Sequence, residues 1–229
     1  MMIQGITGIR IVAAAGLLLL TVGAHAGLMA YQANGVDLVY DDDYTPTGAS
    51  APGLTWTADA NLAASETFGV TGIDANGIMT WDKALEWIDA MNMANYAGVN
   101  DWRLWSALNR NGSGPCSEFD CTDSELGHLF YIEGGLSASD MITSSTVLTD
   151  VFTNMQDNVY WSDTEFSVSD AWYFGTDVGD QSNFSKGNQV YVWAVRPGQV
   201  AAAPLPGTAM LMALGLLGLG AGRMGRLWP

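Results

Sequence analysis

Few side chains in the sequence have the reactivity for covalent or metal chemistry. After the first 26 residues the chain has two cysteines, Cys116 and Cys121, and one histidine, His128. In an oxidising compartment two cysteines this close form a small disulfide loop. A metal or redox pair is the alternative, but the spacing is not Cys-x-x-Cys and there is no second cysteine pair. We therefore expect a disulfide that makes the loop around residues 112–122 rigid.

His128 limits the catalytic possibilities, because no Ser/His/Asp triad can be built without it. Thr122 and Glu125 stand just before it and are interpreted as a capping box that starts a helix. A packed or hydrogen-bonded histidine is therefore the main expectation. A glycosidase would instead need two carboxylates in a cleft. Four glutamates are candidates by residue type alone: Glu118, Glu125, Glu133 and Glu165.

Two other charged features are candidates for binding. Asp41, Asp42 and Asp43 offer oxygen ligands for calcium, although such a run is more often a solvated turn and the EF-hand pattern is absent. Arg103 is a rare cation among many carboxylates. We expect it to form a bidentate pair with an Asp or Glu, and the alternative is an anionic ligand.

The elements that must position these residues indicate an α+β fold. Residues 80–91 place apolar side chains at helical spacing, with Thr80 as N-cap. Residues 36–40 and 54–57 have strand composition, and the last third reads as strands at 159–162, 171–174 and 190–195. Helices first and strands last predict a single compact α+β domain over residues 27–199.

Charge excludes one class of function. Residues 27–199 carry five cations and all 24 acidic residues, so their formal charge is 5 − 24 = −19. Such a body repels phosphate backbones, so we expect no nucleic-acid partner. Anionic lipid and sulfated polysaccharide are disfavoured for the same reason.

Both termini are apolar. Residues 1–26 have a cation at Arg10, a short apolar run and Ala24-His25-Ala26, which together predict a cleaved signal peptide; an uncleaved anchor is the alternative. Residues 200–207 form a linker, 208–222 a hydrophobic helix and 223–229 a basic tail. Arg223 and Arg226 would stay cytoplasmic, which places the acidic body outside. A buried core helix is the alternative for 208–222.

The C-terminal segment resembles the PEP-CTERM sorting signal of exported bacterial proteins. The motif stands here as Pro204-Leu205-Pro206, without the usual Glu, followed by the apolar helix and the arginines. The resemblance implies an inner-membrane anchor, processing by an exosortase, and then association with the cell surface or with extracellular polysaccharide in a biofilm matrix.

The body resembles the C-terminal domain of Legionella collagen-like adhesins, the Lcl C-terminal domain. Six stretches carry the resemblance: 54–56, 79–85, 100–104, 160–165, 171–173 and 195–196. Trp105 departs from the family, which usually has Pro after the Trp-Arg-Leu stretch. The resemblance implies a C-type-lectin-like α+β fold and adhesive, glycan-binding roles, and it brings no catalytic residues. The Glu-Pro-Asn calcium-sugar motif of lectins is absent.

These observations favour an exported, non-catalytic protein that binds matrix polysaccharide, with no cofactor except a candidate calcium ion. Exposed aromatic rings stack on neutral sugar faces. The body has eight tryptophans, of which we expect at least six to be buried; Trp105 is the candidate for an exposed, ligand-binding one. The alternatives are a structural matrix protein without a small ligand and, less favoured, a carboxylate-dependent glycan-active enzyme.

Overall fold

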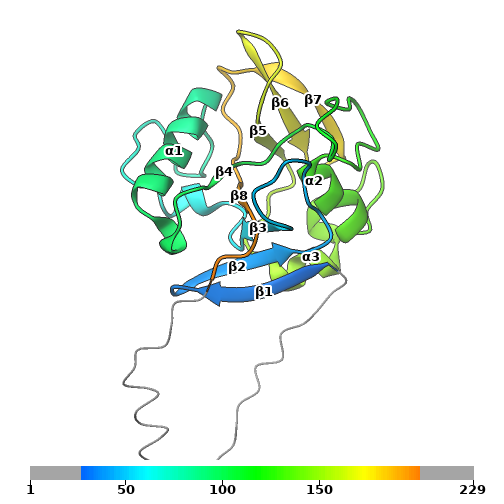
Figure 1. The fold of residues 1–229 in the computed structure, drawn as a ribbon. Helices are drawn as coiled ribbons and strands as arrows, with labels where there is room; N and C mark the ends of the chain where they lie inside the picture. The colour runs from blue at the N-terminus through cyan, green and yellow to red at the C-terminus, as the bar shows by residue number, and fades with distance from the viewer. Residues whose placement is uncertain (1–26, 202–229) are drawn as a thin grey trace, which may run out of the picture.

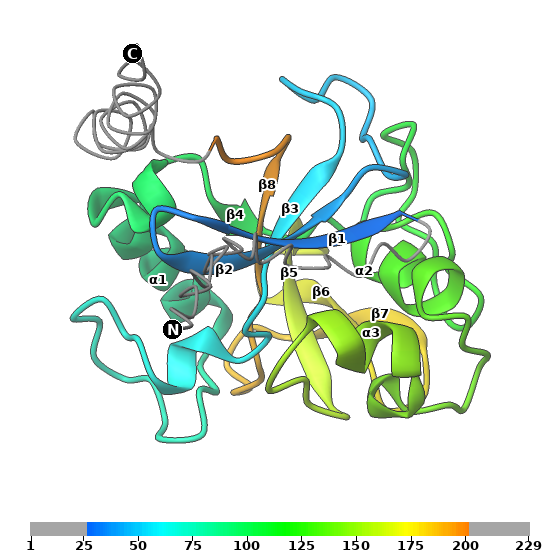
Figure 2. The ribbon, with the colours of Figure 1, turned by 90° about the horizontal axis from the view of Figure 1, so that it is seen from below.

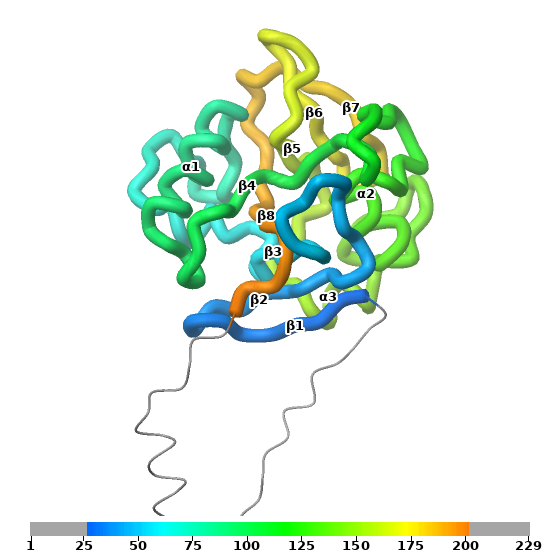
Figure 3. Tube along the Cα trace, viewed as in Figure 1, coloured from blue at the N-terminus to red at the C-terminus, as the bar shows by residue number. Residues whose placement is uncertain are grey.

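The computed structural model describes residues 27–201 of the chain (Figure 1). The predictions for residues 1–26 and 202–229, which include the signal peptide, Pro204, Leu205, Pro206, Arg223 and Arg226, lie outside these residues. The described part is a mixed α+β domain with two antiparallel sheets, as predicted. Both described ends lie on the β1–β2 side of the molecule (Figures 1 and 3).

The first sheet has five strands in the order β1-β2-β3-β8-β4. Its chain positions are β1 Leu28–Ala33, β2 Val36–Asp41, β3 Leu54–Thr57, β8 Ala194–Pro197 and β4 Arg103–Leu104. Asn34 and Gly35 both have positive φ, as a two-residue hairpin turn requires, and so join β1 to β2. The last strand therefore lies between β3 and β4, in a sheet built mostly from the start of the domain.

The second sheet is a meander in the order β5-β6-β7. It consists of β5 Val159–Glu165, β6 Asp170–Gly175 and β7 Asp180–Ser185. Three helices surround the sheets: α1 Trp81–Met93, α2 Glu125–His128 and α3 Thr146–Val151. Seen from below, α1 lies on one side of the β1–β2 ribbon and α2 on the other (Figure 2). A single π-helical turn, Leu129–Glu133, extends α2.

All eight tryptophans of the domain are buried, which confirms the expectation that at least six are. Several indole N–H groups also tie segments together, since Trp81 donates to the Ser162 carbonyl and Trp161 donates to the Met79 carbonyl. Trp193 donates likewise to the Thr57 carbonyl. These three rings thus fill the core and satisfy their N–H groups by joining distant parts of the chain.

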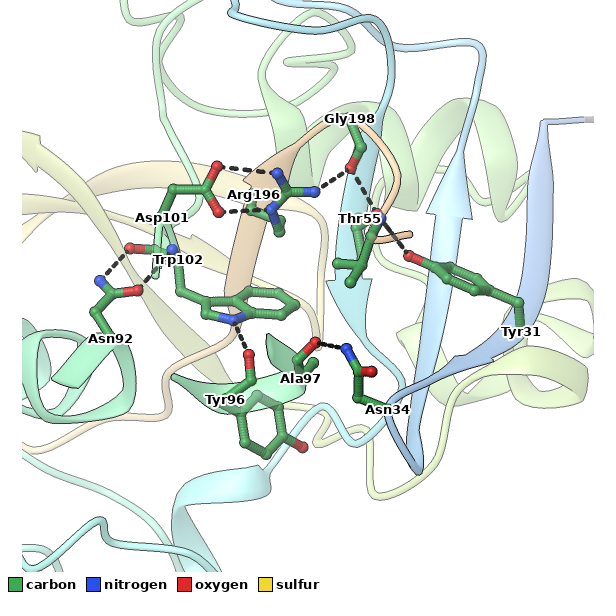
Figure 4. Close-up of polar contacts among 11 residues, drawn as sticks. Tyr31, Asn34, Thr55, Asn92, Tyr96, Ala97, Asp101, Trp102, Arg196 and Gly198 are labelled. Atoms are coloured by element: carbon green, nitrogen blue, oxygen red, sulfur yellow. Dashed lines mark hydrogen bonds and ion pairs between the residues drawn. The ribbon is translucent and has the colours of Figure 1, made fainter. Parts of the chain in front are cut away.

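The end of the domain is fastened by a chain of hydrogen bonds (Figure 4). The Val200 amide donates to the Tyr31 hydroxyl, which donates to Thr55 Oγ1, which donates to the Gly198 carbonyl, at 3.0, 3.1 and 2.7 Å. Arg196 on β8 makes a bidentate pair with Asp101, at 2.7 and 2.9 Å. β8 is therefore held on both sides by polar contacts.

Three expectations about the elements need correction. The order is not helices first and strands last, because β1, β2 and β3 precede α1. In the predicted last strand, Val190 and Tyr191 form only isolated bridges, and the strand itself is Ala194–Pro197. Thr122 and Glu125 form no capping box: Ser124 is the N-cap of α2 and accepts from the Gly127 amide. The Glu125 side chain does not cap the helix, because its carboxylate is paired with Arg103.

Candidate functional site: a polar cleft and a buried charged cluster

An open cleft of about 460 Å³ lies between the 44–50 loop and the segment from β4 to α2. Backbone and small side chains of the loop form one wall. Polar and charged side chains form the other parts of the lining: Tyr44, Arg103, Ser106, Asn109, Arg110, Glu125 and Asp163. The cleft thus offers hydroxyl, amide, guanidinium and carboxylate groups together, which suits a ligand with many hydrogen-bonding groups.

The pair formed by Arg103 and Glu125 is the fixed centre of this lining. Arg103 NH1 and NH2 donate to the two Glu125 carboxylate oxygens at 2.7 and 2.5 Å, and the Ser106 amide donates to the same carboxylate at 2.7 Å. Burial acts to lower the pKa of Arg103, but the Glu125 carboxylate outweighs it and raises that pKa above its usual range. The predicted bidentate pairing of Arg103 is therefore confirmed.

Asp163 is the second carboxylate of the cleft. It lies on β5, where the register with β6 shifts between Trp161 and Glu165, and such irregularities re-aim side chains. Burial raises the pKa of Asp163 to about 6, while Arg103 opposes the rise and Glu125 adds to it. Its carboxylate accepts from the Thr164 hydroxyl at 2.9 Å. Asp163 therefore changes charge just below neutral pH.

Tyr44 and Arg110 form the back of the cleft and separate it from a buried cluster. The Arg110 guanidinium lies over the Tyr44 ring, 4.4 Å from its centroid. Arg110 NH2 also lies 3.3 Å from His128 Nδ1, and the Tyr44 ring is 5.0 Å from the His128 ring. His128 is the part of the buried cluster nearest to this wall.

The buried cluster consists of Asp41, His128 and Glu133. Their exposed fractions are 0%, 5% and 8%, and one polar atom of each lies within 4.8 Å of the others. The register of β1 with β2 places Asp41 at the end of its strand, and the π-helical turn brings Glu133 next to His128. His128 Nε2 and Glu133 Oε1 are 3.3 Å apart. The three groups come from elements far apart in the sequence.

The cluster is incompletely satisfied. Among the described residues, Asp41 Oδ2, His128 Nε2 and Glu133 Oε2 are buried without a hydrogen-bond partner. Burial raises the pKa of Asp41 to about 7, and the neighbouring Glu133 carboxylate also acts to raise it. Unpaired buried polar atoms cost free energy, so a cluster with three of them indicates a missing partner.

A divalent metal ion fits this cluster poorly. The guanidinium has only donors, so the contact with Arg110 requires His128 Nδ1 to accept, and the proton of the neutral ring is then on Nε2. That nitrogen faces Glu133, and a protonated nitrogen does not ligate a metal. Calcium prefers six to eight oxygen ligands, which two carboxylates do not supply alone. A hydrogen-bonded histidine, as expected, fits better.

The remaining predicted residues have mixed outcomes. Cys116 and Cys121 form the predicted disulfide. Asp41 is buried whereas Asp42 and Asp43 are exposed, so the three carboxylates do not share one environment. The aspartate run is instead a turn in which Asp41 Oδ1 accepts from the Asp43 amide.

The expectation that Trp105 is exposed is wrong. Its side chain is 0% exposed and packs edge-on against Phe174, with 6.3 Å between ring centroids. It follows β4, whose pairing with β8 directs the chain into the core. No tryptophan of the described domain is available for stacking on a sugar.

Three important residues were not identified as site residues from the sequence: Tyr44, Arg110 and Asp163. Asp163 lies two residues after Trp161 in a segment with strand composition. A charged residue within such an aromatic segment was the signal that could have identified it. Tyr44 and Arg110 gave no local signal, because their roles depend on a loop contact between distant segments.

Comparison with known proteins gives no further assignment: no protein-family model and no curated protein matches the chain. Within residues 27–201, none of the helices combines the length and the apolar character needed to cross a bilayer. The site must therefore be interpreted from its own chemistry.

Proposed function

We propose that the protein is an exported, non-catalytic module of an extracellular or biofilm matrix that binds neutral or cationic polysaccharide in the cleft. The resemblances to the PEP-CTERM signal and to the Lcl C-terminal domain, together with the −19 body, support this proposal. The observation that carries it is the open polar cleft of about 460 Å³. A surface without a cleft would have favoured the structural alternative.

The cleft provides what recognition of a sugar requires. Asn109 and Ser106 offer amide and hydroxyl groups, and Asp163 offers a carboxylate acceptor. Hydroxyl groups of a glycan both donate and accept, so a lining with both kinds of group matches them. Sulfated chains are disfavoured, because residues 27–199 carry a formal charge of −19.

The same lining supports binding more than catalysis. Glycoside hydrolysis uses two carboxylates as acid and base or nucleophile. Of the two described carboxylates that line the cleft, Glu125 already accepts from Arg103 and from the Ser106 amide. Asp163 is the other carboxylate, and burial raises its pKa to about 6. A binding module therefore accounts for the site with fewer assumptions than an enzyme.

Affinity electrophoresis of the exported protein through neutral and cationic polysaccharides tests the proposal. Ser50 is exposed at the rim of the cleft, and Ser50→Trp should fill the opening and weaken retention at least tenfold. Met93→Trp, at an exposed position of α1 outside the lining, is the matched control and should retain the affinity of the unmodified protein. If no polysaccharide retains the protein, or if both variants bind equally, the proposal is wrong.

A further inference from the structure

The incomplete buried cluster lies directly against the first residue of the described domain. A Cβ built on Gly27 would lie 2.6 Å from both carboxylate oxygens of Glu133. The α-nitrogen of a residue is ~2.5 Å from its Cβ position, so the Gly27 nitrogen lies within roughly 5 Å of that carboxylate. Any side chain at position 27 would collide there, and the φ of +88° also favours glycine.

Gly27 is held in this place by the sheet. The Asp42 amide donates to the Gly27 carbonyl at 2.9 Å, and Leu28 pairs with Asp41 in the register of β1 with β2. The position of its nitrogen is therefore set by backbone pairing and does not depend on a flexible end. It is also the residue that follows Ala26, the last residue of the predicted signal peptide.

The charges of the cluster call for a cation. Asp41 and Glu133 bring two carboxylates, and Arg110 contacts the far side of the His128 ring. With the His128 proton on Nε2, the imidazole is neutral, so Arg110 is the one cation among residues 27–201 that is seen to contact this cluster. Arg110 also lies 3.9 Å from Asp123, so part of its charge is already compensated. Asp41 Oδ2 and Glu133 Oε2, which have no hydrogen-bond partner in the described structure, are acceptors that a small cationic donor would satisfy.

We propose that removal of the signal peptide creates this cation: the new α-ammonium group of Gly27 pairs with the carboxylates of Glu133 and Asp41 and completes the buried cluster. Water adds across the Ala26–Gly27 peptide bond, leaving a carboxylate on Ala26 and an ammonium on Gly27. The inference rests on the export part of the proposed function. Export processing then becomes a step that stabilises the fold, because an unprocessed chain has an uncharged amide at this position.

The pairing has a measurable consequence for the amine. An exposed α-amino group titrates at about 8. Glu133 lies directly against Gly27, and Asp41 and His128 lie with Glu133 in one cluster whose polar atoms are within 4.8 Å of one another. Arg110 lies behind the imidazole, and the exposed Asp42 lies beside Gly27. The two carboxylates favour the charged amine and oppose the effect of burial, so its pKa should lie above 8.

The test uses the full chain, expressed with export and purified in its exported form. Intact mass first identifies its N-terminus. Acetylation by acetic anhydride across pH 7–10 then compares the Gly27 amine in native protein and in urea, with the partly exposed Lys83 as internal reference. We expect at least tenfold slower acetylation in the native state at pH 8, and a raised amine pKa. Glu133→Gln should lose most of this protection, whereas Asp42→Asn, which changes an exposed neighbouring carboxylate, should keep it.

Each result decides the matter. A chain that retains Met1 overturns both export and this inference, whereas cleavage at another bond overturns the inference and leaves export standing. A chain that begins at Gly27 but is acetylated at the same rate folded and unfolded overturns only the inference. A native mass that includes a bound metal ion likewise overturns only the inference. If Glu133→Gln does not fold, the amine pKa of the unmodified protein still decides, since a value of 8 or lower contradicts the pairing.

Discussion

Replacing Glu125 by glutamine should destabilise the domain strongly, because it breaks the pair at the centre of the cleft. The Glu125 side chain is 1% exposed and its carboxylate accepts from two Arg103 nitrogens and from the Ser106 amide. Glutamine has nearly the same shape but places an NH₂ group against a donor. Arg103 then keeps its charge in a mostly buried position without its bidentate partner.

The magnitude follows from the burial of the two partners. Removing one partner of a fully buried ion pair costs about 3–5 kcal/mol of unfolding free energy. The Arg103 side chain is 28% exposed, so water compensates part of the loss. We therefore expect a destabilisation of roughly 2–3 kcal/mol. The pKa of Asp163 should also fall below its value of about 6, because the Glu125 charge contributes to raising it.

Urea unfolding, monitored by tryptophan fluorescence, measures the unfolding free energy of each variant. The matched control is Glu86→Gln, which breaks the Lys83–Glu86 pair on α1, where the side chains are 35% and 52% exposed. Such a surface pair contributes about 0–1 kcal/mol. If Glu125→Gln unfolds at the same urea concentration as the control variant, the buried pair does not hold the cleft together and the reasoning is refuted.

Two further predictions concern Asp163 and Trp105. The raised pKa of Asp163 means that its contribution to stability is present below pH 3.8 and is lost as pH rises through about 6. The stability of the unmodified protein relative to Asp163→Asn should therefore fall from pH 4 to pH 7, by at most about 3 kcal/mol for a pKa raised from 3.8 to about 6; a difference that rises with pH contradicts this. Trp105→Ala should lower the unfolding free energy by about 3–5 kcal/mol, because it opens a cavity in the core. Thermal unfolding measures the loss, and Phe166→Ala, at a 54% exposed position, is the control. An equal effect of the two variants would show that Trp105 is not part of the core.

The local signals of the sequence identified most elements correctly. The apolar face at 80–91 predicted α1, and strand composition, rich in aromatic and β-branched residues, predicted β2, β3, β5 and β6. β1 was missed although Asn34-Gly35 is the sequence typical of a two-residue hairpin. β7, Asp180–Ser185, has a polar sequence and is a strand because it pairs with β6. Its structure comes from its neighbours and not from propensity.

The site was harder to predict than the elements, because its residues meet only through long-range pairing. The chemical expectation for Arg103 succeeded, since a rare cation in an acidic chain must find a carboxylate. Which carboxylate it finds depends on the β4–β8 pairing. Trp105 shows the opposite case: a polar flanking sequence suggested exposure, whereas the preceding strand directs the ring inward.

The cleft and the buried cluster share a wall, and this connects the two proposals physically. Asp41 Oδ1 accepts from the Tyr44 amide at 3.1 Å, so the cluster holds the backbone of a residue that lines the cleft. Arg110 contacts His128 on one side and covers the Tyr44 ring on the other. A change of charge at Asp41 therefore reaches Tyr44 of the cleft lining directly, and a change at Glu133 reaches Arg110 of the lining through His128. Because an ionised pair of carboxylates without a cation would repel itself in this position, pairing with the Gly27 ammonium would also keep Tyr44 and Arg110 in the arrangement that shapes the cleft.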